Sequence, residues 1–176
     1  MEGMEIIIIL TAILQSIGVS LGVGSSTLAI TNFFVAIADG EIDANERRMM
    51  GIVYIVLRVA MVIIALTTAL LSIIQYSIHG MSFVSPFIIS FWLLIAVLYI
   101  NAVLMTKHLM PSNFGPSLQA STWYTMGVLM ALSSVGTIGF SLPQFILAYG
   151  AVIFLAISLV NGMMAYLQAK RDPQAM

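Results

Sequence analysis

The second apolar stretch of the chain reads MMGIVYIVLRVAMVIIALTTALLSIIQY, from Met49 to Tyr76, and holds one charged side chain, Arg58. A membrane-spanning helix needs about 20 mostly apolar residues at about 1.5 Å of rise each, so this stretch is long enough to cross a bilayer. Over the whole chain 61% of residues are hydrophobic and 7% are charged, whereas in soluble domains about 25% of residues are charged. We therefore expect an integral membrane protein.

Four other stretches meet the same requirement, and local signals separate them. Ser85 before Pro86 is typical of a helix start with proline in the first turn, and Ser141 with Gln144 is typical of a capping box. The sequence therefore predicts an all-α, polytopic membrane bundle that forms one domain over residues 1–176. Its five transmembrane helices are expected at Ile6–Ala38, Met49–Tyr76, Pro86–Thr106, Leu118–Gly139 and Leu142–Leu167.

The cations other than Arg58 fall in alternate gaps between these stretches. With five crossings, all of them would face one side of the membrane, and an excess of Lys and Arg beside spanning helices marks the cytoplasmic side. We expect the amino terminus outside, the carboxyl terminus in the cytoplasm, and the inner (plasma) membrane of a bacterium or archaeon as the location. These cations are Arg47, Arg48, Lys107, Lys170 and Arg171.

Arg58 has two interpretations, because a charge at the bilayer centre costs about 2.5 to 3.5 kcal/mol on insertion scales and usually marks function. In the first, the side chain lies near the cytoplasmic interface and its guanidinium reaches lipid headgroups. In the second, it points inward and lines a cytoplasm-facing vestibule that attracts anions. The candidate binding residues of that vestibule, beside Arg58, are Ser25, Ser26, Thr31 and Asn32.

A row of small residues marks the first stretch, which reads QSIGVSLGVGSS over residues 15–26. Gly18, Gly22 and Gly24 are expected to pack against other helices, because small residues let helices approach closely in lipid. A helix over Ile6–Ala38 is also longer than a bilayer core of about 30 Å. It must tilt, kink at these glycines or protrude into the cytoplasm.

The same stretch, a polar residue followed by Ile-Gly and then Gly-x-Gly, resembles the first helix of small copper-resistance-D-like and cytochrome-b-like membrane bundles. Some of those bundles carry a haem-ligating His on such a helix, where this chain has Gln15. The resemblance implies the scaffold without that ligand, and Gln15 is a further candidate binding residue. Because His79 and His108 lie in gaps on opposite sides of the expected bundle, we predict no cofactor and keep haem only as a disfavoured alternative.

The acidic segment around the first inner turn has residue types that suit a hard cation, and Asp39, Asp43 and Glu46 are weak candidate metal ligands. Counted as a calcium-binding loop, the segment would need ligands at Val35 and Ile37, which have no side-chain oxygen. A turn explains it better, with Asp43 capping the second helix and Glu46 completing a capping box. We expect the turn and predict no metal.

Reactive groups are scarce in the apolar stretches. The chain has no cysteine, and every Asp and Glu lies in a terminus or in the first inner loop, so the sequence offers no nucleophile beside a base. Asn101 is expected to join two helices through a hydrogen bond. A net charge of −1 gives no basic face for nucleic acid. We therefore expect neither an enzyme nor a nucleic-acid-binding protein.

Three functions are compatible with this pattern. The first choice is a non-enzymatic subunit, scaffold or small-molecule binding bundle in the lipid bilayer, as a homo-oligomer or as part of a membrane complex, because packing motifs outnumber reactive groups. The second is a small oligomeric channel or transporter whose cytoplasmic mouth lies near Arg58. The third, implied only by the resemblance, is a membrane redox subunit that uses haem or quinone.

Overall fold

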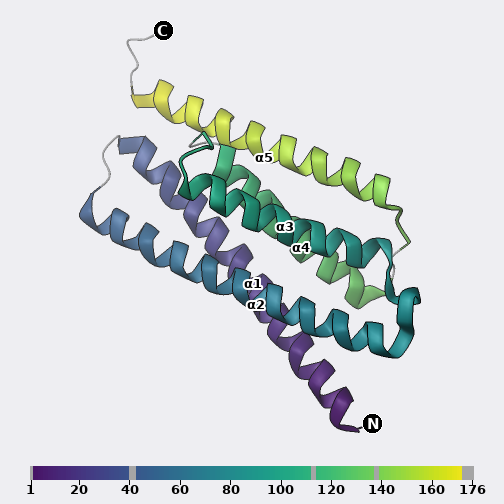
Figure 1. Cartoon of the computed structure of the whole chain (residues 1–176). Helices are drawn as coiled ribbons and strands as arrows, with labels where there is room; N and C mark the ends of the chain where they lie inside the picture. Colours follow the sequence, from purple (N-terminus) through teal and green to yellow (C-terminus); the bar gives the residue numbers. More distant parts are fainter. Residues whose placement is uncertain (1, 40–42, 112–113, 137–138, 172–176) are drawn as a thin grey trace.

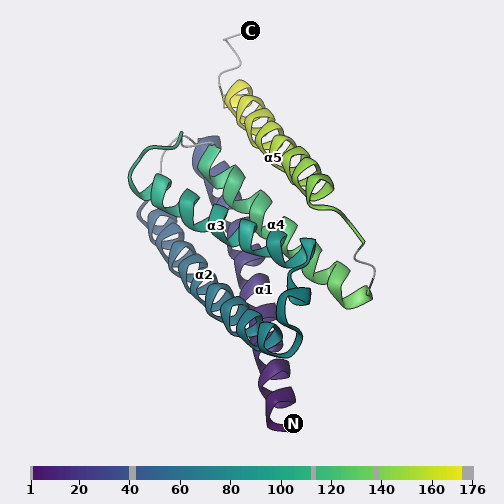
Figure 2. The ribbon, with the colours of Figure 1, turned by 45° about the vertical axis from the view of Figure 1, so that its right-hand side comes forward.

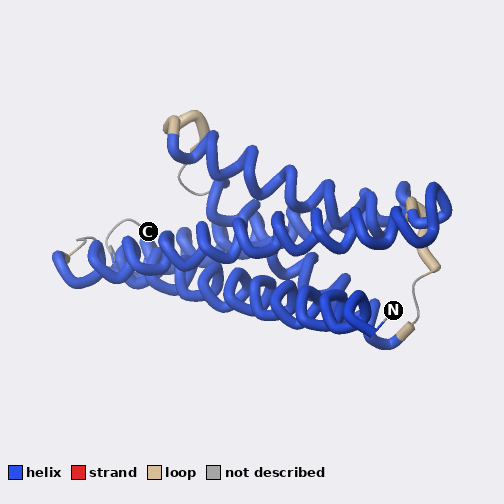
Figure 3. The backbone as a smooth tube through the Cα atoms, turned by 60° about the horizontal axis from the view of Figure 1, so that its bottom comes forward, coloured by secondary structure: helices blue, strands red, loops and turns tan. Residues whose placement is uncertain are grey.

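The computed structural model describes residues 2–39, 43–111, 114–136 and 139–171. These residues form helices joined by short connections, without a strand, which confirms the all-α prediction for this part of the chain (Figure 3). The elements in chain order are α1 (Glu2–Asp39), α2 (Ala44–His79), the short 3-10 helix η1 (Gly80–Phe83), α3 (Pro86–Thr106), α4 (Phe114–Val135) and α5 (Leu142–Arg171).

Four of these helices are long and apolar enough to cross a membrane, which confirms a bundle of membrane-spanning type. The candidate spans are Gly3–Val35, Ala44–Phe83, Pro86–Thr106 and Leu142–Leu167. The helix α4 is absent from this set because it carries more polar side chains. Four of them are buried inside the bundle, namely Ser117, Gln119, Ser121 and Thr122.

The helices alternate in direction, so that each connection lies at one end of the bundle or the other (Figure 1). The helices α1 and α2 form a long hairpin, and α4 packs against α1, α3 and α5. In Figure 2, α5 lies beside α4 and away from α2. One end of the bundle therefore gathers the described cations Arg47, Arg48, Lys107 and Lys170, and we call it the basic end.

The first helix, α1, extends beyond the other helices of the bundle at its amino-terminal end (Figures 1 and 2). It has 38 residues, or about 57 Å at 1.5 Å per residue, and it is continuous through Gly18, Gly22 and Gly24. Figures 1 and 2 show a straight helix whose amino-terminal turns project beyond the other helices. The glycines therefore do not kink α1, and its projecting turns lie at the end opposite the basic end.

Local capping signals set several helix starts as expected. The side chain of Asp43 accepts a hydrogen bond from the Glu46 backbone at 2.7 Å, and the Glu46 carboxylate accepts one from the Asp43 backbone at 3.1 Å. The capping box at Ser141 is also present, because the Gln144 side chain accepts from the Ser141 backbone at 2.8 Å. Ser85 caps α3 through a bond from Ile88 at 3.4 Å.

The ends of α4 differ from the prediction. The helix begins at Phe114, four residues before the expected Leu118, because Pro116 fits the first turn, where its missing N–H leaves no bond unmade. It ends at Val135 instead of Gly139. Gly136 follows with φ +75°, a left-handed conformation that glycine adopts without strain and that commonly ends a helix.

Candidate functional site

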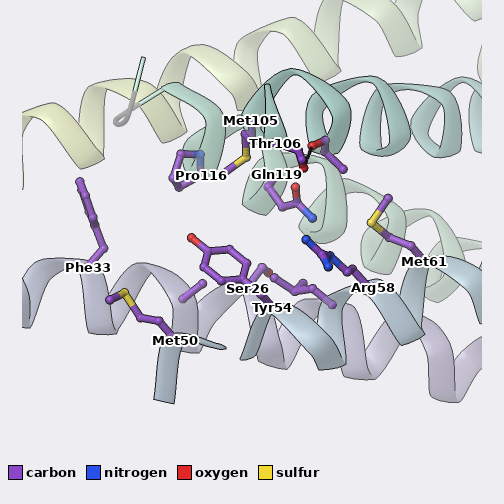
Figure 4. Close-up of a pocket in the computed structure, with 13 residues that line it drawn as sticks. Ser26, Phe33, Met50, Tyr54, Arg58, Met61, Met105, Thr106, Pro116 and Gln119 are labelled. Carbon is purple, nitrogen blue, oxygen red and sulfur yellow. Dashed lines mark hydrogen bonds between the residues drawn. The ribbon is translucent and has the colours of Figure 1, made fainter. Parts of the chain in front are cut away.

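A cavity of about 260 Å³ lies in the half of the bundle nearer the basic end, between α1, α2, α3 and α4 (Figure 4). Its polar lining comes from Ser26, Tyr54, Arg58, Thr106 and Gln119. The rest of its wall is apolar and formed by Ala29, Phe33, Met50, Leu57, Met61, Ala102, Met105 and Pro116. We call this space the Arg58 cavity.

The guanidinium of Arg58 points from α2 into this cavity, toward Gln119 of α4 (Figure 4). Its side chain also borders an outer groove between α2 and α3 that Lys107 lines. The nearest acidic residue on α2 is Glu46, more than three helical turns away. Arg58 is exposed and forms no ion pair within the described residues, so no acidic side chain of that part of the chain neutralises its charge.

The orientation of the Gln119 side chain follows from a hydrogen-bond chain behind the cavity. The Nδ2 of Asn101 donates to the carbonyl of Gly115 at 2.9 Å and to the Oε1 of Gln119 at 3.2 Å. A carbonyl only accepts, so the amide of Asn101 must present its nitrogen to Gly115. The amide oxygen of Gln119 then faces Asn101. The predicted role of Asn101 in joining helices is confirmed, here between α3 and α4.

Two hydrogen-bond donors consequently face one another across the cavity. The oxygen of the Gln119 amide is turned back to Asn101, and its nitrogen lies on the side of Arg58 (Figure 4). A guanidinium has donors and no acceptor, so it cannot bond to an amide nitrogen. Because Gln119 is only 9% exposed, its donor is held in place. A group with acceptor atoms placed between the two would satisfy both.

The apolar wall suits a compact hydrophobic body next to that acceptor. Three methionines, Met50, Met61 and Met105, line it together with the ring of Phe33. Methionine side chains are flexible and polarisable, so such a wall adapts to ligands of different shape. The geometry fits an organic anion, with its charged group at Arg58 and Gln119 and its apolar part toward the methionines.

The sequence-derived candidates for the vestibule are only partly brought together. Ser26 lines the cavity, although its hydroxyl donates to its own helix at Val23, 3.0 Å away. Ser25 is buried without lining the cavity. Thr31 is exposed, and its hydroxyl donates to the carbonyl of Thr27 at 2.9 Å. Asn32 is half-buried, and its Nδ2 has no hydrogen-bond partner in the described part of the chain.

Gln15 lies about three turns from Ser26 on α1 and donates to the hydroxyl of Thr68 on α2 at 2.8 Å. It therefore belongs to the other half of the bundle. His79 is the last residue of α2, and His108 follows α3, so the two histidines are near opposite ends of α3. They do not approach Gln15 or one another.

The three glycines of α1 have different surroundings. A Cβ at Gly18 would come within 2.8 Å of the Ile63 side chain of α2, and one at Gly22 within 2.2 Å of the Trp123 ring of α4. Gly24 has nothing within 4 Å. Gly18 and Gly22 thus make room for large side chains of neighbouring helices, and Gly24 faces open space.

The weak metal candidates do not form a described cluster. Asp43 and Glu46 hydrogen-bond to one another's backbone in the capping box. Asp39 is the last residue of α1, and residues 40–42 lie outside the described part of the chain. Among the described residues, no three His, Asp or Glu side chains are grouped so as to hold a metal ion.

Sequence reasoning missed Gln119 and Tyr54, which line the cavity with Arg58. The available signal was the polar content of α4, whose buried side chains include the amide of Gln119. Comparison with protein-family models, with characterised proteins and with solved structures finds no match to this chain. The site therefore has to be interpreted from its own geometry.

Proposed function

We propose that this protein is a non-enzymatic membrane bundle that binds a small organic anion in the Arg58 cavity. The observation that carries the proposal is the pair of donors, the Arg58 guanidinium and the Gln119 amide nitrogen, which face one another across an otherwise largely apolar space (Figure 4). A carboxylate or sulfonate offers several acceptor oxygens in one plane or tripod, and arginine binds such groups with two parallel hydrogen bonds.

Energetic reasoning supports an anion over a neutral ligand. A cation in a membrane is costly unless it is paired or solvated, and Arg58 has no acidic partner within the described residues. Binding an anion supplies the missing counterion. Hydrogen bonds to charged groups contribute about 1.5 to 3 kcal/mol each, so losing the guanidinium should weaken binding by roughly tenfold to a hundredfold.

The proposal includes a topology. We infer five spans, with α4 crossing beside α3 and α5 although it is less apolar than they are. The amino terminus then lies outside and the carboxyl terminus in the cytoplasm of a bacterial or archaeal cell. The support is the common position of Arg47, Arg48, Lys107 and Lys170 at the basic end, because such an excess of cations marks the cytoplasmic side.

The binding test uses calorimetry on the full chain in lipid nanodiscs. Benzenesulfonate is the probe, because it carries a fixed negative charge on an apolar ring. Benzylammonium has a similar ring with the opposite charge, and benzyl alcohol has a similar ring without charge. We expect saturable heat with benzenesulfonate and no saturable heat with benzylammonium or benzyl alcohol.

Two variants on the same helix locate the site. The change Arg58→Gln removes the charge that lines the cavity, whereas Arg47→Gln removes a charge of the same helix that does not line it. We expect Arg58→Gln to weaken benzenesulfonate binding by roughly tenfold to a hundredfold and Arg47→Gln to leave it unchanged. Equal affinity in the wild type and Arg58→Gln would refute the proposed site.

A further inference from the structure

A second cavity occupies the half of the bundle away from the basic end. It has a volume of about 420 Å³, and α1, α2, α3 and α4 contribute to its wall, the same four helices that enclose the Arg58 cavity. Its wall holds amides and hydroxyls but no charged side chain, and we call it the amide cavity. The polar residues that line it are Gln15, Thr68, Ser72, Gln75, Ser85 and Ser133.

The two cavities follow one another along the axis of this four-helix unit. On α1, Gln15 lines the amide cavity and Ser26 lines the Arg58 cavity, about three turns apart. On α4 the corresponding residues are Met130 and Gln119, again about three turns apart. The helices α2 and α3 keep the same order. The cavities are therefore two compartments of one interior.

A layer of buried residues lies between the two cavities. Each of the four helices contributes at least one buried residue between the two linings, and the large side chains of this layer are 0% exposed. Such a layer blocks water and ions, because it offers them neither space nor a polar partner. We call these residues the central layer: Gly22, Ile64, Leu94, Leu98, Trp123 and Met126.

Trp123 is the largest member of the central layer, and its indole N–H lacks a hydrogen-bond partner in the described residues. Its ring lies directly over Gly22, where a Cβ would come within 2.2 Å. The indole Nε1 is also buried. A buried indole N–H normally finds a partner, so the closed arrangement leaves a donor unmet. Rotation of the indole, or entry of water between the cavities, would give this N–H a hydrogen-bond partner.

We propose that the two cavities are the ends of one route that carries the anion of the Arg58 cavity across the membrane, and that the Trp123 indole is its closed gate. For its substrate class this inference rests on the proposed function. Arg58 attracts the anion at the basic end, and the uncharged amide cavity receives it beyond the central layer. Opening requires the indole to leave Gly22 and the neighbouring apolar side chains of the central layer to part with it.

The first experiment measures access without any anion. The chain has no cysteine, so single substitutions report their own surroundings. Ser26→Cys places a thiol in the Arg58 cavity, Thr68→Cys places one in the amide cavity, and Ser90→Cys places one in a fully buried position that lines neither. A membrane-impermeant, charged methanethiosulfonate is then added to sealed vesicles of each orientation.

We expect Ser26→Cys to react from one side only, Thr68→Cys from the opposite side only, and Ser90→Cys from neither. Adding Trp123→Ala should let the reagent reach both cavity thiols from both sides. Trp123→Leu, which leaves a smaller void, is made in parallel in case the alanine variant does not fold. Labelling of the two cavity thiols from the same side, or unchanged sidedness in the folded Trp123 variants, would overturn the route.

The second experiment measures flux of benzenesulfonate from loaded proteoliposomes. We expect slow flux in the wild type, several-fold faster flux with Trp123→Leu, and wild-type flux with Phe145→Ala, which empties a core position on α5, a helix that lines neither cavity. If benzenesulfonate binds but no variant carries it, the route is wrong and the binding site stands. If the thiols behave as expected but Arg58→Gln binds benzenesulfonate normally, the proposed function is wrong and the route stands.

Discussion

The indole of Trp123 on α4 lies against the backbone of Gly22 on α1, so closely that the smallest side chain would come within 2.2 Å of its six-membered ring. The contact joins the middle of the α1–α2 hairpin to the central helix of the bundle. It also explains why α1 has a glycine at this height, where any other residue would push the two helices apart.

The first prediction concerns this contact. Gly22→Ala should lower the free energy of unfolding by about 1 to 3 kcal/mol, the usual cost of overpacking a core, because the Trp123 ring is 0% exposed and can move away only by giving up its packing in the core. Gly24→Ala is the matched control on the same helix, since nothing lies within 4 Å of its added methyl group. Thermal unfolding in detergent micelles, followed by tryptophan fluorescence, should show a lower midpoint for Gly22→Ala alone. Similar midpoints for the two variants would contradict the packing.

The second prediction concerns the bond between α3 and α4. Asn101→Leu removes the donor to Gly115 and Gln119, and interhelical hydrogen bonds in membranes contribute about 0.6 to 1.7 kcal/mol. Thr106→Val is the control, because that hydroxyl bonds only to Ala102 of its own helix. Unfolding in mixed micelles should show that Asn101→Leu lowers the free energy of unfolding by an amount near the upper part of that range. Thr106→Val should leave the free energy of unfolding almost unchanged. A comparable loss in both would mean that the amide does not join the helices.

The third prediction concerns the attachment of α5. The hydroxyl of Thr122 donates to the carbonyl of Leu118 at 2.6 Å, so in its 2.7 Å contact with Tyr149 it must accept. Tyr149→Phe therefore removes the donor without changing the ring. A double-mutant cycle with Thr122→Val should give a coupling of about 0.6 to 1.7 kcal/mol. Additive effects of the two changes would show that this bond contributes nothing to holding α5.

The fourth prediction concerns orientation. Lys107 and Arg47 lie at the basic end, and His79 lies at the other end of the bundle. In spheroplasts, an impermeant thiol reagent should label His79→Cys directly, and should label Lys107→Cys and Arg47→Cys only after the cells are opened. Labelling of positions 79 and 107 from the same side would refute the crossing of α3 and the proposed topology with it.

Features that depend on neighbouring residues were predictable from the sequence. The capping side chains Asp43, Ser85 and Ser141 act within one helical turn, so their roles follow from local spacing alone. The end of α4 was predicted too late because Gly136 and Gly139 both suit a helix end, and only the backbone conformation of Gly136 distinguishes them.

Only the part of the site that lies on the α1–α2 hairpin was predictable from the sequence. Folding the first two apolar stretches back on one another puts Ser26 and Arg58 at the same height, and both line the cavity. Gln119 reaches that height from a helix that follows two further connections. Its approach depends on how α4 packs against α1 and α3, and a single glutamine in the sequence carries no information about that packing.

The polar character of α4 has a consequence for how the chain enters the bilayer. A segment with the buried amide of Gln119 partitions poorly into lipid when it leaves the insertion machinery alone, since this amide then lacks its partner Asn101 on α3. The apolar helices α1, α2 and α3 precede α4 in the chain, so they can be inserted first and then pack against α4. Biogenesis of this protein should thus depend on cooperative insertion, and truncation before α5 should leave α4 weakly held.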